Sequence, residues 1–317
     1  MIVAVGTPLV DHIHFVTDEE LYRFAKAKGG MQRLDEAGLK RLLEDPSFKS
    51  VPTSGGSAAN TLKGLCHLGE ACAFIGKRGD DASGREYEKK LRQMGIDTYL
   101  SSGKLPTGHA ICLVTPDGER TMRTFTGAGQ EMRAEDLPEE VLEKAALVHV
   151  EGYMLFCPGV CEAAMRGAGG QISLDLASFE VVEQFKEQII DLASRYVDIL
   201  FANEKEAFAL TGFRPERACQ ALLELVPLAV VMVGIEGAFI GSRGKVTPIS
   251  AIEVPPYDST GAGDLFESGF LCGYLRGQSL EQAAHLGAKA AHEVVKILGT
   301  ELSAETWKRL KTPAEGA

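Results

Sequence analysis

Residues 258–264 read Asp-Ser-Thr-Gly-Ala-Gly-Asp, and this stretch decides the fold. Apolar residues follow it at helical spacing, as Phe266, Phe270 and Tyr274, so the glycines should lie at the N-terminus of a helix. Main-chain N–H groups are free at such an end and the helix dipole is positive there, so the turn predicts an anion site. A carboxylate at Asp264 would repel that anion, unless it faces a substrate hydroxyl and takes its proton.

The turn therefore predicts a phosphoryl-transfer site that contains both a phosphate-binding group and a base. Gly261, Ala262 and Gly263 would hold the transferring group, and Asp264 would activate the attacking alcohol. For Gly-Ala-Gly alone, a glycine-rich loop before a helix is the simpler interpretation. The full seven-residue string is more specific than that.

Length and composition indicate one large domain with room for a small appended one. The 317 residues are 45% hydrophobic, which is enough to bury a full core. The 33 Lys and Arg residues against 44 Asp and Glu residues give a formal charge of -11, and no basic run interrupts this balance. We therefore expect neither nucleic acid nor membrane as a partner. A phosphate ligand would have to be bound by local features such as helix ends, because the protein as a whole is negatively charged.

The chain is expected to be cytoplasmic. Its first residues lack the basic leader of a signal peptide, and no apolar run is long enough to cross a bilayer. Seven scattered cysteines, an odd number, fit a reducing compartment and are interpreted as small buried hydrophobes.

Short apolar runs alternate with helical patterns along most of the chain. These runs, at 2–6, 71–76, 147–150, 172–176, 197–202 and 229–233, predict a mostly parallel sheet with helices on both faces. Ligands bind beyond the carboxyl ends of such strands, so Asp11 could accept hydrogen bonds from sugar hydroxyls. A solvated loop carboxylate is the equally weighted alternative.

The pattern changes to strand-like alternation over residues 98–127. Two strands, at 108–115 and 120–126, are joined through Asp117-Gly118 and predict a hairpin. A hairpin does not bury itself alone, so we expect it to pack with residues 11–16 as a small sheet over the site. Arg120 and Arg123 have opposite strand parity, so only one of them can point into the cleft.

Two further segments offer ligand-binding groups. In the string Gly55-Gly56-Ser57-Ala58-Ala59-Asn60, the glycine pair would let a ligand touch the main chain, and Asn60 supplies a donor and an acceptor. Residues 203–206, Asn-Glu-Lys-Glu, form a helix capping box that needs no further function. Gly234 and Gly237 follow another predicted strand and permit close main-chain approach.

Taken in order along the chain, these motifs resemble those of the ribokinase-like (PfkB) family of carbohydrate and nucleoside kinases, in its adenosine-kinase-like branch. The resemblance rests on 55–60, 203–206 and 258–264, and on Glu151-Gly152-Tyr153 and the helical insertion before Gly55. It implies an α/β ribokinase-like fold with a small β-sheet lid, in which Asp264 is the catalytic base. Gly261, Ala262 and Gly263 would form the anion hole, with Arg120 on the phosphate charge.

The resemblance also implies the remaining site residues and the cofactors. The substrate would be held by Asp11, Leu9, Gly55, Gly56, Asn60 and Tyr153. ATP would be held by Asn203, Gly234, Gly237, Thr260, Gly261 and Gly263, and Mg²⁺ by Asn203 and Glu206 through water. A monovalent cation is left open. Met232 departs from the family's usual Thr, and Thr7 from the Asn of true adenosine kinases.

The expected domain division follows from these segments. Residues 1–10, 52–96 and 128–312 would form the large nucleotide-binding domain, part of 11–51 with 97–127 the lid, and 313–317 a mobile tail. The predicted function is an ATP-dependent kinase that phosphorylates the hydroxymethyl group of an adenosine-like nucleoside or a sugar, as a monomer or homodimer. Alternatives are a free-sugar kinase of the ribose or fructose type and a non-catalytic regulatory homologue that binds nucleosides.

Overall fold

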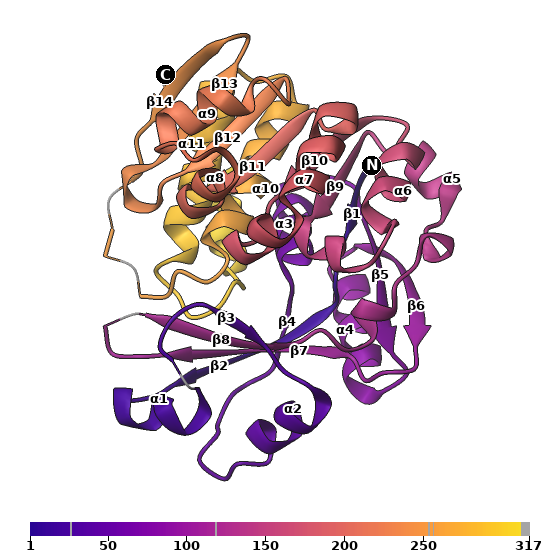
Figure 1. The fold of residues 1–317 in the computed structure, drawn as a ribbon, viewed down its shortest axis with the longest axis vertical. Coiled ribbons are helices and arrows are strands. Elements are labelled where there is room, and N and C mark those ends of the chain that lie inside the picture. Colours follow the sequence, from indigo (N-terminus) through magenta and orange to yellow (C-terminus); the bar gives the residue numbers. More distant parts are fainter. Residues whose placement is uncertain (26, 118, 253, 256, 312–317) are drawn as a thin grey trace.

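The computed structural model describes residues 1–25, 27–117, 119–252, 254–255 and 257–311, which form two β-sheets with flanking helices (Figure 1). The larger sheet has nine strands in the order β14-β13-β12-β11-β10-β9-β1-β5-β6. Its strands are β1 (Ile2–Val5), β5 (Cys72–Gly79), β6 (Asp97–Gly103), β9 (Leu147–Glu151), β10 (Gln171–Asp175), β11 (Ile199–Asn203), β12 (Leu228–Met232), β13 (Ala238–Ser242) and β14 (Lys245–Ile249). All neighbours are parallel except β12-β13 and β13-β14.

Helices cover both faces of this sheet because its central strands are apolar on both sides. Val3 and Val5 enter one hydrophobic core, and Ile2 and Ala4 enter the other. The first core is covered by α5 (Glu139–Glu143), α6 (Val160–Gly167), α7 (Phe179–Tyr196), α8 (Glu204–Thr211) and α9 (Pro215–Leu222). The second is covered by α3 (Ser57–Leu68), α4 (Ala82–Gln93), α10 (Ala262–Leu275), α11 (Leu280–Val294) and α12 (Ala304–Lys311). The predicted fold class is confirmed.

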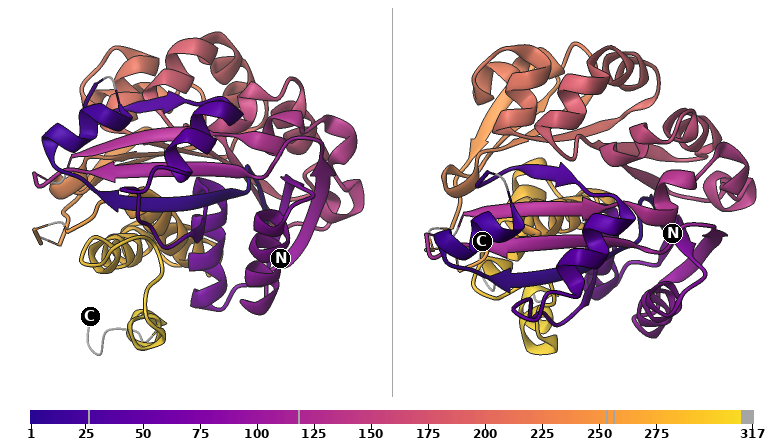
Figure 2. Two further views of the ribbon diagram at one scale, coloured as in Figure 1. Left: turned by 90° about the horizontal axis from the view of Figure 1, so that it is seen from below. Right: turned by 60° about the horizontal axis from the view of Figure 1, so that its bottom comes forward.

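The smaller sheet lies below the carboxyl ends of the parallel strands (Figures 1 and 2). Its order is β3-β8-β7-β2-β4, with β2 (Leu9–Phe15), β3 (Met31–Arg33), β4 (Thr53–Gly55), β7 (Gly108–Val114) and β8 (Arg120–Phe125). The strands β7 and β8 are antiparallel and β2 pairs with β7, as the sequence predicted. Two helices, α1 (Asp18–Phe24) and α2 (Glu36–Leu43), pack against the outer face through Leu21 and Leu39. We call this sheet with α1 and α2 the lid.

Sheet membership differs from the predicted division at two places. Strand β6, expected in the lid, pairs with β5 at the edge of the larger sheet, and β4, expected in the large domain, pairs with β2 in the lid. As an edge strand β6 is half exposed, so its alternation looks like that of a lid strand. The string Thr17-Asp18-Glu19-Glu20 is a capping box and predicts a helix that stops at Gly29-Gly30, but α1 ends at Phe24. The hairpin of β13 and β14 was not predicted.

Two predictions fall on residues outside the described ranges, namely the turn glycine Gly118 and the mobile tail 313–317. Within the described ranges, no helix combines the length and the apolar character that crossing a membrane requires.

Candidate active site

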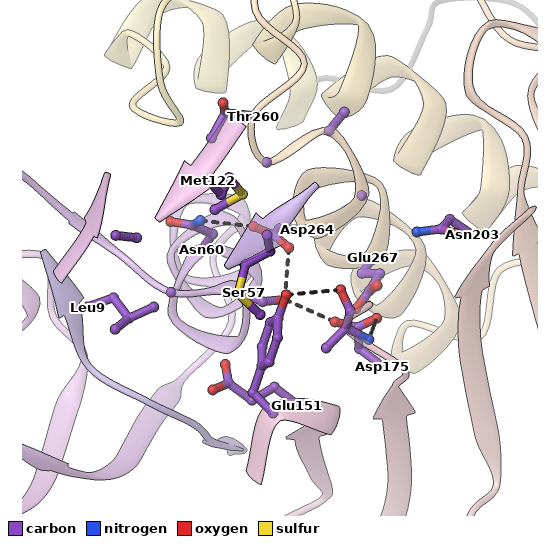
Figure 3. Close-up of a pocket in the computed structure, with 18 of the residues that line it drawn as sticks. Leu9, Ser57, Asn60, Met122, Glu151, Asp175, Asn203, Thr260, Asp264 and Glu267 are labelled. Atoms are coloured by element: carbon purple, nitrogen blue, oxygen red, sulfur yellow. Dashed lines mark hydrogen bonds between the residues drawn. The ribbon is translucent and has the colours of Figure 1, made fainter. Parts of the chain in front are cut away.

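A pocket of about 470 Å³ lies between the lid and the carboxyl ends of the parallel strands. Nearly every residue that the sequence singled out lines it (Figure 3). These residues are Leu9, Asp11, Gly56, Asn60, Arg120, Tyr153, Asn203, Glu206, Gly234, Gly237, Thr260, Gly261, Ala262, Gly263 and Asp264. Gly55 does not line the pocket and lies behind Asp11 instead.

The glycine turn begins a helix, as predicted. Helix α10 has Gly261 as its N-cap in the left-handed conformation, with φ 73°. Asp258 shapes the preceding turn: Oδ1 accepts the N–H and hydroxyl of Thr260 at 2.9 and 2.6 Å, and Oδ2 accepts the N–H of Gly299 at 2.9 Å. The N-terminal end of α10 thus faces the pocket. The Ala262 N–H donates to the Ser259 carbonyl at 3.3 Å, and the amides of Gly263 and Asp264 lie in the first turn, which has no acceptors within the helix.

Asp264 lies in the first turn of α10 and points into the pocket (Figure 3). Its Oδ1 accepts a hydrogen bond from the Ser57 hydroxyl at 2.9 Å, and its Oδ2 accepts one from Asn60 Nδ2 at 2.8 Å. The Thr300 hydroxyl donates to Asn60 Oδ1 at 3.2 Å, which sets the orientation of that amide. Burial raises the pKa of Asp264, while the two donors and the charge of Lys63 oppose this shift. The carboxylate is therefore held in one orientation.

The pocket residues to which the sequence gave no role include Ser57, Glu151, Asp175 and Glu267. Two of them end parallel strands, Glu151 on β9 and Asp175 on β10, where the rule for ligand sites at strand ends would have found them. Glu267 lies one turn after Asp264 in a buried part of α10, and an acidic residue there is itself a signal. Glu151 accepts the main-chain N–H groups of Thr7 and Ala58 at 2.6 and 3.0 Å.

Apolar side chains line part of the pocket, which we call the apolar slot. From the lid, Leu9, Met31, Ala110 and Met122 line it, and from the large domain Tyr153 and Phe156 of the 3-10 helix η3 (Gly152–Phe156). The guanidinium of Arg33 lies 4.7 Å from the centre of the Phe156 ring, so a lid side chain contacts the large domain here. The polar residues Asp11, Asn60 and Asp264 line the same pocket, and Asp11 lies beside Ala110 in the lid sheet.

The two arginines of β8 lie on opposite faces of the strand. Arg120 lines the pocket, and its Nη1 donates to Thr260 Oγ1 at 3.2 Å. Arg123 is buried on the other face, where it donates to the carbonyl oxygens of Met122 and Ala27 at 2.8 and 3.3 Å. Arg120 is therefore the one placed beside the glycine turn.

Another part of the pocket is formed by loops after β11 and β12. Met232, Gly234 and Gly237 line it together with Asn203. The Met232 methyl group would lie 3.6 Å from a Cβ added to Gly263, so a thioether rather than a hydroxyl borders the glycine turn. With Thr7, Met232 is one of the two residues noted above at which the sequence departs from the family pattern.

Asn203 and Glu206 form the capping box that the sequence predicted. Asn203 Oδ1 accepts the N–H groups of Lys205 and Glu206 at 2.9 and 3.0 Å, and the Glu206 carboxylate accepts from the Asn203 main chain and side chain. Burial, followed by the charge of Asp175, raises the pKa of Glu206 to about 8. Among the described residues, no group of three or more His, Cys, Asp or Glu side chains has the geometry of a metal site.

The buried acids make stability depend on pH. Burial raises the pKa of Asp11 and of Glu151 to about 7 and that of Glu206 to about 8, whereas the unfolded values are near 4. The native protein therefore holds more protons than the unfolded chain up to about pH 8. We expect the free energy of unfolding of the ligand-free protein to fall from pH 6.5 to 8. The slope is about 1.4 kcal/mol per pH unit for each proton that the native protein holds in excess of the unfolded chain.

Urea unfolding at constant ionic strength would measure this slope. Burial lowers the pKa of His12 and His149 from 6.5 to about 4, so these two residues make the stability rise with pH between those two values. The measurement therefore starts at pH 6.5, above this range. The variant Asp11→Asn should show a flatter slope. A wild-type stability that rises steadily from pH 6.5 to 8 would contradict the expectation.

Known proteins resemble this chain in both sequence and fold. Residues 43–307 match the pfkB family of carbohydrate kinases. An adenosine kinase from Sinorhizobium meliloti is 31% identical with a TM-score of 0.90, covering 98% of this chain and 99% of its own. A probable sugar kinase from Rhizobium etli CFN 42 is 31% identical with a TM-score of 0.91, covering 98% and 97%. The ribokinase of Arabidopsis thaliana is 28% identical, over 85% of this chain and 73% of that protein.

The family match covers most of the chain, and the structural likeness extends over both the larger sheet and the lid. The glycine turn and Asp264 lie within the matched residues, whereas Leu9, Asp11, Met31 and Arg33 of the pocket precede them. The chain therefore belongs to the pfkB family of carbohydrate kinases, phosphotransferases that act on hydroxyl groups of sugars or nucleosides.

Proposed function

We propose that the protein transfers the terminal phosphoryl group of ATP to the hydroxymethyl group of a nucleoside. The observation that carries the choice of a nucleoside is the apolar slot. Leu9, Met31 and Met122 of the lid and Tyr153 and Phe156 of the large domain line the same pocket as the polar residues Asp11, Asn60 and Asp264. A flat, largely apolar nucleobase suits such a slot, because apolar and aromatic surfaces on both sides remove its faces from water.

The polar part of the pocket fits the sugar and its reacting hydroxyl. Asp11 and Asn60 are hydrogen-bonding groups beside Asp264, so the ribose hydroxyls would bind to them while the hydroxymethyl group meets Asp264. As the oxygen of the hydroxymethyl group attacks phosphorus, Asp264 takes the proton from that oxygen. The main-chain amides at Gly261–Gly263 and the guanidinium of Arg120 would stabilise the negative charge on the phosphoryl oxygens.

ATP would lie with its phosphates at the glycine turn and its remaining part over Gly234, Gly237 and Asn203. The acidic wall of the pocket suits a divalent cation, but the oxygens of Asn203 and Glu206 are engaged in the capping box. The residues therefore fit a Mg²⁺ held through its water ligands. When bound, this ion would supply positive charge to the phosphates.

Substrate screening tests the proposal. In an assay coupled to ADP release, with ATP and Mg²⁺, we expect adenosine or another nucleoside to give a kcat/KM at least about tenfold above that of ribose or fructose, because only a base buries apolar area in the slot. Arabidopsis ribokinase resembles this chain, so a free-sugar kinase is the competing function. A preference for ribose or fructose would establish it.

A non-catalytic homologue would give a different result. Calorimetry would then detect binding of nucleoside and ATP while no ADP or phosphorylated product accumulates. Chromatography of the product from the preferred nucleoside, with a 5′-deoxynucleoside as the control acceptor, would show whether the hydroxymethyl group is the site of transfer.

A further inference from the structure

A serine hydroxyl joins two carboxylates at the floor of the pocket. Ser57 Oγ lies 2.9 Å from Asp264 Oδ1 and 3.0 Å from Asp175 Oδ2 (Figure 3). A hydroxyl has a single proton, so Ser57 can donate to only one of them at a time. The second oxygen of each carboxylate has its own donor, Asn60 Nδ2 for Asp264 at 2.8 Å and the Ala177 N–H for Asp175 at 3.1 Å. Ser57 is therefore the donor that the two carboxylates share.

Packing holds this arrangement in place. Ser57 and Asn60 belong to the first turn of α3, and Asp264 belongs to α10. The two helices approach closely at Gly64, where an added Cβ would lie 2.3 Å from Ser268 Oγ, one turn beyond Asp264. The donors and the carboxylate thus sit on two helices whose spacing is set by direct contact.

The backbone beside Asp175 is also specialised. Ala177 has φ 66°, a left-handed conformation that is unfavourable for a residue with a side chain. This conformation directs the Ala177 N–H to Asp175 Oδ1. Strained residues of this kind gather at functional sites, where the surrounding structure compensates for their cost.

Charged groups surround the carboxylates of Asp264 and Asp175, whereas Ser57 between them is neutral. Lys63 of α3 and Arg120 of β8 act on Asp264 with positive charge. Several acids act on Asp264, on Asp175 or on both with negative charge, namely Asp11, Glu151, Glu206 and Glu267. A neutral hydroxyl is the group that can bind Asp264 whether it is ionised or protonated, because it donates and accepts.

We propose that Ser57 and Asp175 are positioning residues for Asp264, an inference that rests on the proposed function. While Asp264 is ionised, the Ser57 hydroxyl donates to its Oδ1. As the O–H bond of the acceptor breaks, its oxygen bonds to the terminal phosphorus of ATP, the bond from that phosphorus to the bridging oxygen breaks, ADP leaves, and the acceptor's proton passes to Asp264. The new carboxyl group donates to Ser57 Oγ, and the serine proton turns toward Asp175 Oδ2.

The proton is best placed on Oδ1 of Asp264. Asn60 Nδ2 donates to Oδ2, and the Thr300 hydroxyl on Asn60 Oδ1 keeps that amide from turning round. A proton on Oδ2 would face another donor, whereas a proton on Oδ1 faces the lone pairs of Ser57. The Ser57–Asp264 hydrogen bond is then present before and after proton uptake, with its direction reversed.

A double-mutant cycle tests the proposal. Ser57→Ala is introduced into the wild-type protein and into Asp264→Asn, and kcat and both KM values are measured with the preferred acceptor. In the wild type we expect kcat to fall by about 10- to 100-fold, the effect of losing a hydrogen bond to a charged group, with KM values within about threefold. In the Asp264→Asn background the same change should alter kcat by less than about twofold, because the group on which Ser57 acts is already neutral.

Three further variants separate positioning from folding. Ser57→Thr keeps the hydroxyl and should regain at least about tenfold of the turnover lost in Ser57→Ala. Asp175→Asn should lower kcat in the wild type and not in Asp264→Asn. If Ser57→Ala does not fold, Asp175→Asn replaces it in the double-mutant cycle. Ser54→Ala is the matched control, since Ser54 Oγ is buried with no hydrogen-bond partner among the described residues, and it should leave kcat unchanged.

The outcomes are distinct. If Asp264→Asn loses turnover while Ser57→Ala does not, or if Ser57→Ala has the same effect in both backgrounds, the positioning role is overturned and the proposed function stands. If Asp264→Asn keeps wild-type turnover, the assigned base is wrong and the inference falls with it.

Discussion

Replacing Asp264 by asparagine is expected to lower kcat by about two or more orders of magnitude while acceptor and ATP still bind. Asparagine has nearly the same shape: its amide oxygen can accept the hydrogen bond from Asn60, and its NH2 group can donate to the Ser57 hydroxyl. It is not a base at neutral pH, and a positioned base typically contributes about 10²- to 10⁴-fold to the rate. The loss should therefore appear in turnover and not in binding.

Steady-state kinetics and calorimetry together check this result. Kinetics give kcat, and calorimetry gives the dissociation constants of acceptor and ATP for the variant. Asp198→Asn is the matched control, because Asp198 accepts the Ile172 N–H at 2.8 Å at the far end of β10 and does not line the pocket. Wild-type turnover in Asp264→Asn would reject Asp264 as the base.

Replacing Gly55 by alanine is expected to raise the KM of the acceptor by about tenfold or more. A Cβ at this position would lie within 1.9 to 2.1 Å of all three carboxylate atoms of Asp11, so the carboxylate must move. The strands β2 and β4 pair at this point, which leaves the main chain little freedom to adjust. Hydrogen bonds to a charged group contribute about 1.5–3 kcal/mol, so displacing Asp11 should cost about 10- to 150-fold in acceptor binding.

The effect should be selective for the acceptor. Asp11 is proposed to hold the acceptor, whereas ATP is proposed to lie over the loops after β11 and β12, so the KM of ATP should change by less than about threefold. Gly167→Ala is a suitable control, since it adds a methyl group to α6 away from the pocket. An unchanged acceptor KM in Gly55→Ala would show that Asp11 does not hold the substrate.

Much of the architecture could be predicted because local signals carry it. The continuous apolar runs indicated strands buried on both faces, and the capping box at Asn203 begins α8 as expected. The glycine turn before α10 was recognised for the same reason, because a helix start and an acidic residue in its first turn are local features. Arg120 and Arg123 could be assigned to opposite faces from strand parity alone.

The predictions that were wrong concern which distant segments of the chain pair with one another. The sequence placed β6 in the lid and β4 in the large domain, because alternation reports exposure and says nothing of which strand is the neighbour. Helix α1 was extended to the glycines at 29–30, although β3 follows it and pairs with β8. These choices depend on contacts made only after the chain has folded.

The sequence by itself determined the family, the order of layers and the position of the anion-binding turn, because each is written in short segments of fixed spacing. Only the tertiary structure decided how Asp264 is held, since Ser57, Asn60 and Asp175 come from α3 and β10, more than 85 residues away along the chain. Hydrogen bonds between such residues form where two helices and a strand end meet, and no periodicity in the sequence specifies that meeting.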